Sequence, residues 1–528
     1  MLQWAGVLRG LRERAPRGVD AALGLTAGAV FALTSPPTDL HALVLVGLVA
    51  FAALLRGPET ARGGAVIGLF FGAGANLVAL RFVPEVIVRF TPLPYVAALL
   101  AWALLSFAQG LSWALAGALA VAARRRAVPA FLAFGAGVYA ALFTPGLFPW
   151  TPAGGLSPWP VTVQLAELVG ERGVSFVVAL GAGLAAEAIA SRGRGRLVLG
   201  ALSAAVAAVV VGYGALRMRA IDGERAAAAK VRVGLVQPGT PATVRWEARA
   251  APAIRDKLNN LTKIAESRGV ALTVWPEASF PYALSHGARL SPTGERAVLS
   301  TGVRGPVVVG LTLLRGAESS TNSALIAEPA SGALPLTRLS APYDKRHLLA
   351  FGETVPLADQ IPWLRRTFAR GTGLVPGDHS APLEAGRVRA GILICYEDNL
   401  PEAGREAMTS GGTRPPNLLV NLTNDAWFAG SAEGELHLRL SVLRAVETRR
   451  DLARAVNLGP TSMVDAAGRV RARYDAPFPK VLDVEVALLE RGRTPYTRFG
   501  DTPLALLVAL AVLAHGWLAQ RRRADATD

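Results

Sequence analysis

The sequence predicts a polytopic α-helical membrane bundle of about eight spans that carries an extramembrane α/β domain. Hydrophobic residues make up 52% of the 528 residues and charged residues only 18%, a composition too apolar for a soluble enzyme of this length. Arginines cluster in alternate loops between the apolar segments, and near residue 228 the composition changes to a soluble α/β pattern. We therefore expect about seven helices in residues 1–217, an α/β domain in 218–502 with its core at 228–490, and a final helix with a basic tail in 503–528.

The first half contains apolar stretches that, with their flanks, reach the length of about 17–25 residues needed to cross a bilayer. The first of them follows a basic segment and could be a signal peptide. No small-residue cleavage site follows it and further apolar stretches come at once, which favours an uncleaved span. The expected spans centre on Ala21–Leu33, Leu43–Leu55, Gly64–Leu80, Tyr95–Ala122, Ala130–Phe143, Val174–Ile189, Leu197–Leu216 and, at the end of the chain, Pro503–Ala519.

The arginines predict the orientation of these spans, because short cytoplasmic loops are enriched in Lys and Arg. The other set of loops holds only Arg81, Arg89 and Arg172. This pattern puts both termini in the cytoplasm and residues 218–502 on the opposite face of the membrane. The basic set is Arg9, Arg12, Arg14, Arg17, Arg56, Arg62, Arg124, Arg125, Arg126, Arg192, Arg194, Arg196, Arg521, Arg522 and Arg523.

Gly64, Gly68 and Gly72 are spaced four residues apart in the third span. Such spacing allows close packing against another helix, although ordinary glycine content in an Ala/Gly-rich bundle explains it equally well. Trp150 and Trp159, in the loop before the sixth span, suit a membrane interface or, alternatively, a lipid entrance.

The domain after residue 228 has more predicted strands than helices, without a strict βαβ repeat. A sandwich of sheets with outer helices fits this pattern better than a doubly wound sheet. Helices are expected at Arg249–Ser267, Pro401–Ser410 and Gly434–Arg450. The expected strands are Val231–Gln237, Val270–Trp275, Pro306–Leu314, Asn322–Glu328, Val388–Tyr396, Asn417–Leu422, Leu452–Leu458, Thr461–Asp465 and Val481–Val486.

The only cysteine, Cys395, ends the apolar run V-R-A-G-I-L-I-C-Y-E. A lone cysteine is either inert packing or a nucleophile. A nucleophilic thiol needs a base and a cation nearby, and Glu277 and Lys345 are candidates because each closes a strand-like segment of the same domain. No P-loop, G-x-S-x-G, H-E-x-x-H or paired-cysteine metal motif is found, so neither a metal nor a cofactor is expected.

Five short motifs, in order, resemble the nitrilase (carbon–nitrogen hydrolase) superfamily, and with the predicted topology nearly the whole chain is similar to its membrane-embedded apolipoprotein N-acyltransferase family. That resemblance implies an α-β-β-α sandwich and a Glu-Lys-Cys triad of Glu277, Lys345 and Cys395. The motifs are W-P-E at Trp275–Glu277, Y-D-K-R-H-L at Tyr343–Leu348, F-G-E at Phe351–Glu353, C-Y-E at Cys395–Glu397 and N-D-A-W-F at Asn424–Phe428.

The resemblance also implies a ping-pong transfer of a fatty acyl chain from a membrane phospholipid, through a thioester on Cys395, to the amino group of a diacylglyceryl lipoprotein N-terminus. Glu277 would act as the base, while Lys345 and the backbone N–H of Tyr396 would hold the oxyanion. By similarity Glu353 and Glu397 support these groups. The residues implied to lie beside the substrates, with Trp427 and Phe428 on a mobile loop, are Trp246, Asn322, Trp427 and Phe428.

The chain departs from the family pattern at three places: residues 155–168, an extra Ala429, and the turn Asn457–Thr461, which reads N-L-G-P-T. These departures leave the triad untouched. His347 and His437 could be bases, but the mechanism already has Glu277, so both are interpreted as structural.

Two other classes of function remain open. A membrane-tethered amidohydrolase would use the same triad on a small amide, with water resolving the intermediate, although a membrane bundle is not needed for such a substrate. A non-catalytic lipoprotein-binding paralogue would be expected to have lost part of the triad. Nucleic-acid binding, suggested by the net charge of +16, is disfavoured because membrane topology already explains the arginines.

Overall fold

The computed structural model describes residues 16–316, 319–330, 336–350, 352–355, 357, 360–361, 363, 373–379, 381–409 and 414–525 of the chain. The chain forms two compact units, Met1–Ala215 with Phe499–Asp528 (unit 1) and Leu216–Arg498 (unit 2). The sequence analysis put the corresponding boundaries at 217/218 and 502/503. Arg9, Arg12, Arg14 and Phe351, all named above, lie outside the described residues, as do the side chains of Arg17, Trp246 and Arg523.

Unit 1 is helical, and each of the eight predicted apolar stretches coincides with a helix of the structure. Five described helices are long and apolar enough to cross a membrane (α4, α6, α9, α10 and α16), whereas α2, α3 and α7 are apolar but shorter. The number of spans therefore stays a prediction. The helices are α2 (Pro16–Ala32), α3 (Leu43–Leu54), α4 (Ala61–Ala79), α5 (Val83–Phe90), α6 (Tyr95–Arg125), α7 (Ala130–Ala141), α8 (Pro152–Leu156), α9 (Ala166–Ala190), α10 (Gly193–Ala227) and α16 (Thr502–Ala524).

Close packing of α4 against α6 decides between the two interpretations of the glycine spacing. A Cβ added at Gly64 would lie 2.4 Å from the carbonyl oxygen of Gly117, and one at Gly68 would lie 2.0 Å from that of Trp113. A Cβ at Gly72 would meet the α6 backbone at 2.6 Å. These separations are shorter than any ordinary van der Waals contact, so the small-residue packing interface is confirmed.

The described residues of unit 2 form two β-sheets. The first has the order β14 (Lys480–Leu488), β1 (Ala229–Gln237), β2 (Leu272–Val274), β4 (Val307–Leu314), β5 (Ser320–Pro329), β6 (Thr337–Leu339), with β3 (Leu284–Ser285) on β4 and β7 (Tyr343–Asp344) on β5. The second has the order β13 (Val470–Tyr474), β12 (Thr461–Val464), β11 (Leu452–Asn457), β10 (Leu418–Asn424), β9 (Val388–Ile394), β8 (Leu383–Ala385). The principal helices are α11 (Ala251–Ser267), α13 (Pro401–Thr409), α14 (Glu433–Thr448) and the short α15 (Pro495–Phe499).

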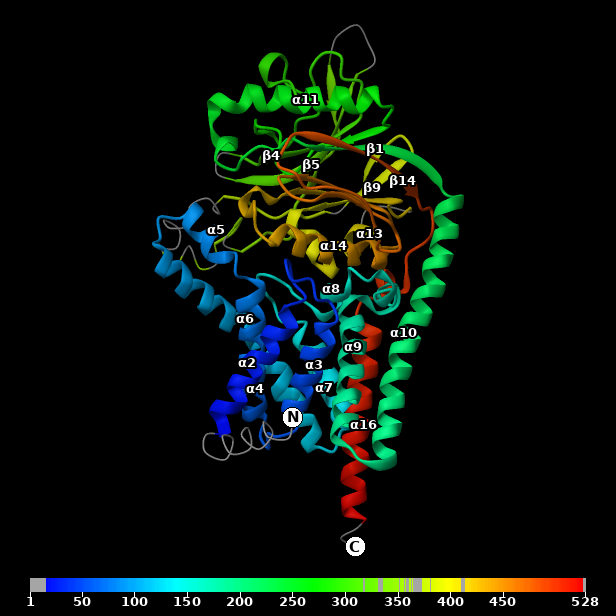
Figure 1. Ribbon diagram of the computed structural model, residues 1–528. Coiled ribbons are helices and arrows are strands. Elements are labelled where there is room, and N and C mark those ends of the chain that lie inside the picture. The colour runs from blue at the N-terminus through cyan, green and yellow to red at the C-terminus, as the bar shows by residue number, and fades with distance from the viewer. Residues whose placement is uncertain are drawn as a thin grey trace. The chain divides into compact units, whose positions relative to one another are not determined.

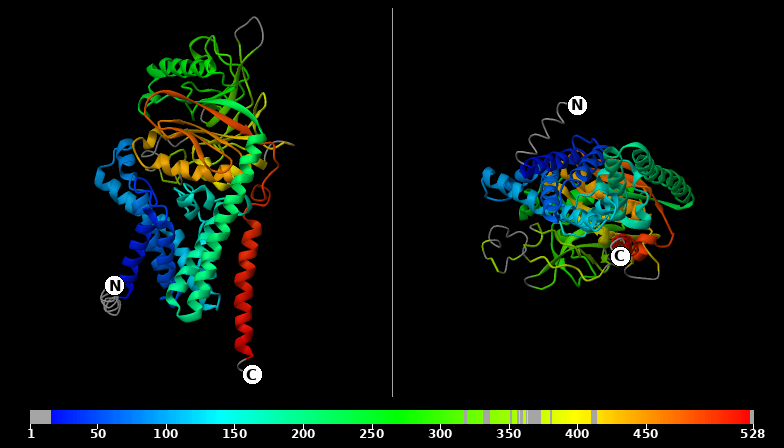
Figure 2. Two further views of the ribbon diagram at one scale, coloured as in Figure 1. Left: turned by 45° about the vertical axis from the view of Figure 1, so that its right-hand side comes forward. Right: turned by 90° about the horizontal axis from the view of Figure 1, so that it is seen from below.

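The sheets pack face to face with helices on both outer sides, as Figure 1 shows and the left view of Figure 2 repeats. Buried apolar residues from both sheets, such as Val233, Ile326, Ile392 and Val420, form the central core. A second core lies between the first sheet and α11, and a third between the second sheet and the pair α13 and α14. The predicted sandwich of sheets with outer helices is confirmed.

Several strands were missed in the sequence, namely β3, β6, β7, β8 and β13. All but β13 have only two or three residues, too few to show an alternating pattern.

Three of the predicted strands position the site: β9, β10 and β11 are neighbours in the second sheet and run parallel. Their carboxyl ends therefore meet at one edge of the second sheet, where loops can gather functional side chains.

The last turns of α10 belong to unit 2 and are fixed there by a buried ion pair. Arg225 donates from Nε and Nη2 to the two carboxylate oxygens of Asp451, at 2.8 and 2.9 Å. Asp451 also accepts from the backbone amides of Ala466 and Ala487. Because paired and fully hydrogen-bonded geometry compensates a buried carboxylate, this residue ties α10 firmly to the second sheet.

We predict that Gly68→Ala destabilises unit 1, because a methyl group 2.0 Å from the Trp113 carbonyl forces α4 away from α6. Overpacking of this kind costs about 1–3 kcal/mol. Gly212→Ala is the matched control, since nothing lies within 4 Å of a Cβ there. Thermal unfolding in detergent should show a lower melting temperature for the first variant and no loss for the second; equal behaviour of the two would contradict the packing interpretation.

Candidate active site

Glu277 lies three residues beyond the end of β2, on a backbone segment held by β4. The amide of Phe280 donates to the carbonyl oxygen of Gly310 at 3.0 Å. A Cβ at Gly310 would lie 2.1 Å from the carbonyl oxygen of Pro276, so the absence of a side chain allows this close approach. Glu277 is only 7% exposed. The loop therefore buries a carboxylate at a defined position.

Lys345 follows β7, and its backbone amide donates to the carbonyl oxygen of Asn322 on β5 at 2.8 Å. Its ammonium lies 2.7 Å from Glu353 Oε2 and 3.3 Å from Glu277 Oε1, and the side chain is buried. The amide nitrogen of Asn322 donates to the same two carboxylates, at 2.7 Å to Glu277 and 3.0 Å to Glu353. One ammonium and one amide thus hold the two glutamates side by side.

Cys395 follows β9 with a φ of +50°, a left-handed conformation that is uncommon for any residue except glycine. Such strain costs on the order of 1–3 kcal/mol and persists only where neighbouring groups enforce it. Burial raises the pKa of the Cys395 thiol well above its ordinary value, the charge of Glu277 raises it further, and Lys345 opposes both. The thiol is therefore protonated at neutral pH and needs a base before it can attack.

The neighbouring charges shift the pKa values of Glu277, Lys345 and Glu353 in different ways. Burial raises the pKa of Glu277, and Lys345 opposes that rise only in part. Burial disfavours the charged form of Lys345, but Glu353 and Glu277 outweigh it and raise the pKa of the ammonium. Despite its burial, Glu353 has a lowered pKa because of Lys345 and the Leu349 amide. Glu353 therefore stays the permanent partner of the cation, and Glu277 is the carboxylate better suited to accept a proton.

Glu397 connects the cysteine turn to the segment that carries the lysine. One carboxylate oxygen accepts from the Ile394 amide at 2.7 Å and from the Tyr343 hydroxyl at 2.8 Å. The other accepts from the amides of Arg346 at 2.7 Å and His347 at 3.2 Å. Because Glu397 is completely buried, its carboxylate links the edges of both sheets at the site.

The remaining predicted residues lie in short 3₁₀ turns, except Asn322, which belongs to β5. Trp246 falls in the 3₁₀ turn η2 (Val244–Trp246), and its side chain is outside the described part of the chain. Trp427 and Phe428 belong to the 3₁₀ turn η7 (Asp425–Phe428), which follows β10. Tyr396 and Glu397 belong to another such turn, η6 (Cys395–Asn399). Asn322, predicted to bind substrate, contacts the carboxylates of Glu277 and Glu353 as described above.

The altered turn after β11 is accommodated by side-chain hydrogen bonds. Asn457 exchanges two hydrogen bonds with the backbone of Thr240, each at 2.8 Å. The Thr461 hydroxyl donates to Gln237 Oε1 at 2.8 Å, and the carbonyl oxygen of Pro460 accepts from Arg454 at 3.2 Å. The inserted proline therefore leaves the end of β11 anchored to the first sheet.

A buried ionic cluster that the sequence analysis overlooked lies beside the cysteine turn. Its members are Asp398, Asp425, Glu433, His437 and Arg454, all largely buried. The sequence does contain an indication of this cluster, namely Arg454 inside the apolar strand L-A-R-A-V-N. An isolated charge does not enter a core, so this arginine must contact buried acidic partners.

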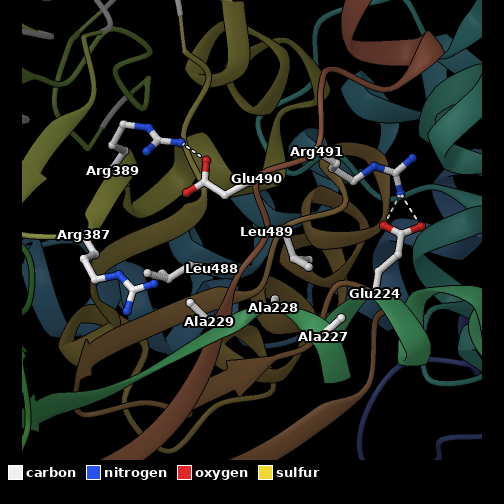
Figure 3. Close-up of a pocket in the computed structure, with 10 residues that line it drawn as sticks. All are labelled: Glu224, Ala227, Ala228, Ala229, Arg387, Arg389, Leu488, Leu489, Glu490 and Arg491. Atoms are coloured by element: carbon white, nitrogen blue, oxygen red, sulfur yellow. Dashed lines mark hydrogen bonds and ion pairs between the residues drawn. The ribbon is translucent and has the colours of Figure 1, made fainter.

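A separate cavity of 580 Å³ lies between the end of α10 and the segment after β14 (Figure 3). Its charged lining is largely paired: Arg389 with Glu490, and Arg491 with Glu224 at 3.1 Å. Neither Cys395 nor its charged neighbours line this cavity. The cavity is therefore separate from the candidate active site.

Comparison with known proteins gives matches along most of the chain. Residues 27–184 match the family described as apolipoprotein N-acyltransferase N-terminal domain, and residues 232–496 match the carbon-nitrogen hydrolase family. The chain is 28% identical to the apolipoprotein N-acyltransferase of Geobacter metallireducens over 96% of both chains, and 30% identical to that of Bradyrhizobium diazoefficiens over 95% of both. Among solved structures, the carbon-nitrogen hydrolase from Helicobacter pylori G27 is similar with 15% identity and a TM-score of 0.36, covering 49% of this chain and 90% of the other.

We predict that Glu277→Gln lowers the pKa of the Cys395 thiol, because the substitution removes a negative charge that disfavours the thiolate. Alkylation of the single cysteine by iodoacetamide, followed by mass spectrometry over a neutral-to-alkaline pH series, should then reach half its maximal rate at a lower pH. Glu328→Gln, at an exposed position of β5, is the control. An unchanged or higher midpoint in Glu277→Gln would contradict the electrostatic account.

Proposed function

The chain belongs to the apolipoprotein N-acyltransferase family, and on this premise we propose how its residues transfer a fatty acyl group to a lipoprotein. The observation that carries the proposal is the buried contact of Lys345 with both Glu277 and Glu353 beside the only cysteine. This arrangement supplies a nucleophile, a base and a fixed cation in one site.

In the first half-reaction Glu277 accepts the thiol proton while Cys395 Sγ attacks the sn-1 ester carbonyl of a membrane phospholipid. Lys345 and the backbone N–H of Tyr396 stabilise the oxyanion of the tetrahedral intermediate. The ester C–O bond then breaks, and Glu277 returns its proton to the departing glycerol oxygen. The products are a lysophospholipid and an acyl thioester on Cys395.

In the second half-reaction the α-amino group of a diacylglyceryl-cysteine attacks the thioester carbonyl. Glu277 accepts a proton from this amine, the C–S bond breaks, and Glu277 gives the proton to the departing sulfur, which regenerates both the thiol and the carboxylate. The same oxyanion donors serve again, because both intermediates are tetrahedral adducts of one acyl carbonyl. The cycle is a ping-pong acyl transfer. In each half-reaction Glu277 takes up one proton and releases it again, and no cofactor takes part.

The physical properties of the substrates favour this function over hydrolysis of a small amide. Long acyl chains leave a bilayer only at a cost of about 0.8 kcal/mol per CH₂, so donor and acceptor must react at the membrane surface. Apolar helices joined directly to the domain suit such substrates. An amidohydrolase that uses the same triad is the second candidate function, and it is distinguished by water rather than an amine resolving the intermediate.

We further propose that the eight apolar helices of unit 1 all span a bacterial inner membrane, with both termini in the cytoplasm. The alternation of arginine-rich and arginine-poor loops supports this topology. Unit 2, inserted between α10 and α16, would then lie on the extracytoplasmic face. Trp246, Asn322, Trp427 and Phe428 are proposed to border the path of the acyl chain or the acceptor peptide.

An acyl-enzyme should form when the purified protein is mixed with phosphatidylethanolamine. Intact-protein mass spectrometry should detect an added fatty-acyl mass that hydroxylamine removes and that passes to a diacylated lipopeptide. Cys395→Ala should show no adduct. Glu277→Gln should acylate about 10²–10⁴-fold more slowly because it lacks the base, and Lys345→Met about 10²–10³-fold more slowly because it lacks an oxyanion donor.

Discharge of the wild-type adduct by water alone, with no transfer to the lipopeptide, would favour the amidohydrolase. A wild-type protein that forms no adduct with phospholipid would contradict acyl transfer altogether.

The proposed topology can be tested because Cys395 is the only cysteine. In a Cys395→Ala background, Gly287→Cys in unit 2 should react with a membrane-impermeant maleimide while the cytoplasmic membrane is intact. Arg194→Cys, at the start of α10, should react only after the membrane is permeabilised; both positions are exposed within their own units. Reversed labelling would overturn the orientation.

A further inference from the structure

His437 lies in the second turn of α14, and both of its ring nitrogens face carboxylates. Its Nε2 is 2.7 Å from Asp398 Oδ1, and its Nδ1 is 3.3 Å from Asp425 Oδ1. A neutral imidazole has one donor only, whereas the imidazolium has two. Burial disfavours the charged ring, but Asp398 outweighs it and the pKa of His437 rises to about 10. The ring is therefore a buried cation at neutral pH.

The two carboxylates belong to the two turns that border the site. Asp398 lies three residues after Cys395 in η6, and Asp425 is the first residue of η7, which carries Trp427 and Phe428. The Nε2 atom of His437 also lies 3.3 Å from the carbonyl oxygen of Cys395, the residue with the left-handed backbone. One side chain thus connects the nucleophile turn, the aromatic turn and α14.

Arg454 on β11 contacts the same carboxylates. Its Nε is 3.3 Å from Asp398 Oδ2, and its Nη2 is 3.7 Å from Asp425 Oδ2. Glu433, one helical turn before His437, lies 3.8 Å from the ring, and burial followed by the charge of Asp425 raises the pKa of Glu433 to about 8. At neutral pH two cations then balance two carboxylates, with Glu433 mostly protonated.

We propose that His437 is a positioning residue for acyl transfer: through Asp398, Asp425 and the Cys395 carbonyl, it holds the nucleophile turn in the conformation that presents the Tyr396 amide to the oxyanion. This inference rests on the proposed function. It assigns His437 no proton transfer, because both nitrogens already donate to buried carboxylates. Loss of the ring lets the strained turn relax, which moves the amide donor but leaves the base and the thiol in place.

A metal ion is the competing interpretation of the same side chains. One ligand atom each from Asp425, Glu433 and His437 lies within 4.8 Å of the others. The Arg454 guanidinium, 3.7 Å from Asp425, opposes a second cation at this position. His437 would also have to lose its proton and its bond to Asp425 in order to bind a metal.

The test compares two reactions of Cys395 in His437→Gln. Alkylation by iodoacetamide needs a thiolate but no oxyanion donor, whereas acylation by phosphatidylethanolamine needs both. We expect the alkylation rate to stay within about threefold of wild type, and the single-turnover acylation rate to fall about 100-fold with little change in the lipid concentration that half-saturates it, as for a lost or misplaced oxyanion donor. Equal losses in both reactions, or no loss of acylation, would overturn the proposal.

Two further variants separate positioning from stability. Val442→Ala truncates a buried apolar side chain of the same helix and should lower the melting temperature while keeping the wild-type acylation rate. His437→Gln leaves two buried carboxylates with Arg454 alone, so the double variant His437→Gln/Asp425→Asn restores the charge balance. We expect it to regain thermal stability but not acylation. Recovery of both acylation and stability would mean that His437 only neutralises the buried carboxylates, and this result would contradict the positioning role.

Metal analysis of the purified wild type completes the test. A stoichiometric bound metal that His437→Gln loses would replace the proposal with a metal site. Failure of the wild type to acylate refutes the proposed function itself, whereas normal acylation in His437→Gln refutes only this inference.

Discussion

The candidate site depends on the ion pairing of the Lys345 ammonium, because a buried charge is stable only when it is paired. Its two partners, Glu277 and Glu353, come from separate loops, and removing one member of such a set costs about 3–5 kcal/mol. Lys345 and Glu277 follow strands of the first sheet, and Cys395 follows a strand of the second. Glu277, Lys345 and Cys395 therefore share one site only because the two sheets pack face to face.

The turn after β9 is held from two sides. Glu397 fastens it to β7 and the segment after it through three hydrogen bonds, and the ionic cluster around His437 fastens it to β11 and α14. A left-handed cysteine is unfavourable by itself, so this enclosure stabilises a backbone that an isolated turn would not keep. The raised pKa of the thiol follows from the same enclosure, since burial disfavours the thiolate.

The apolar helices of unit 1 rely on a different principle. Their side chains gain little from leaving lipid for protein, so close backbone packing must supply the attraction. The glycines of α4 allow this by letting α6 approach to distances that no Cβ would permit. The chain passes from unit 1 to unit 2 through α10, and within unit 2 the Arg225–Asp451 pair fixes the last turns of that helix against the second sheet.

Periodicity and composition were sufficient to predict the apolar helices, the long strands and the sandwich, because each depends on a run of residues long enough to show its pattern. The motifs around Glu277, Lys345 and Cys395 likewise named the candidates for the site. The sequence could not reveal two-residue strands such as β7, which has no period, although β7 determines where Lys345 lies. Nor could it reveal that Asn322 bridges two glutamates, or that His437 joins Asp398 to Asp425. These contacts connect residues far apart in the chain, and only the packing of the two sheets and α14 brings them within hydrogen-bonding distance.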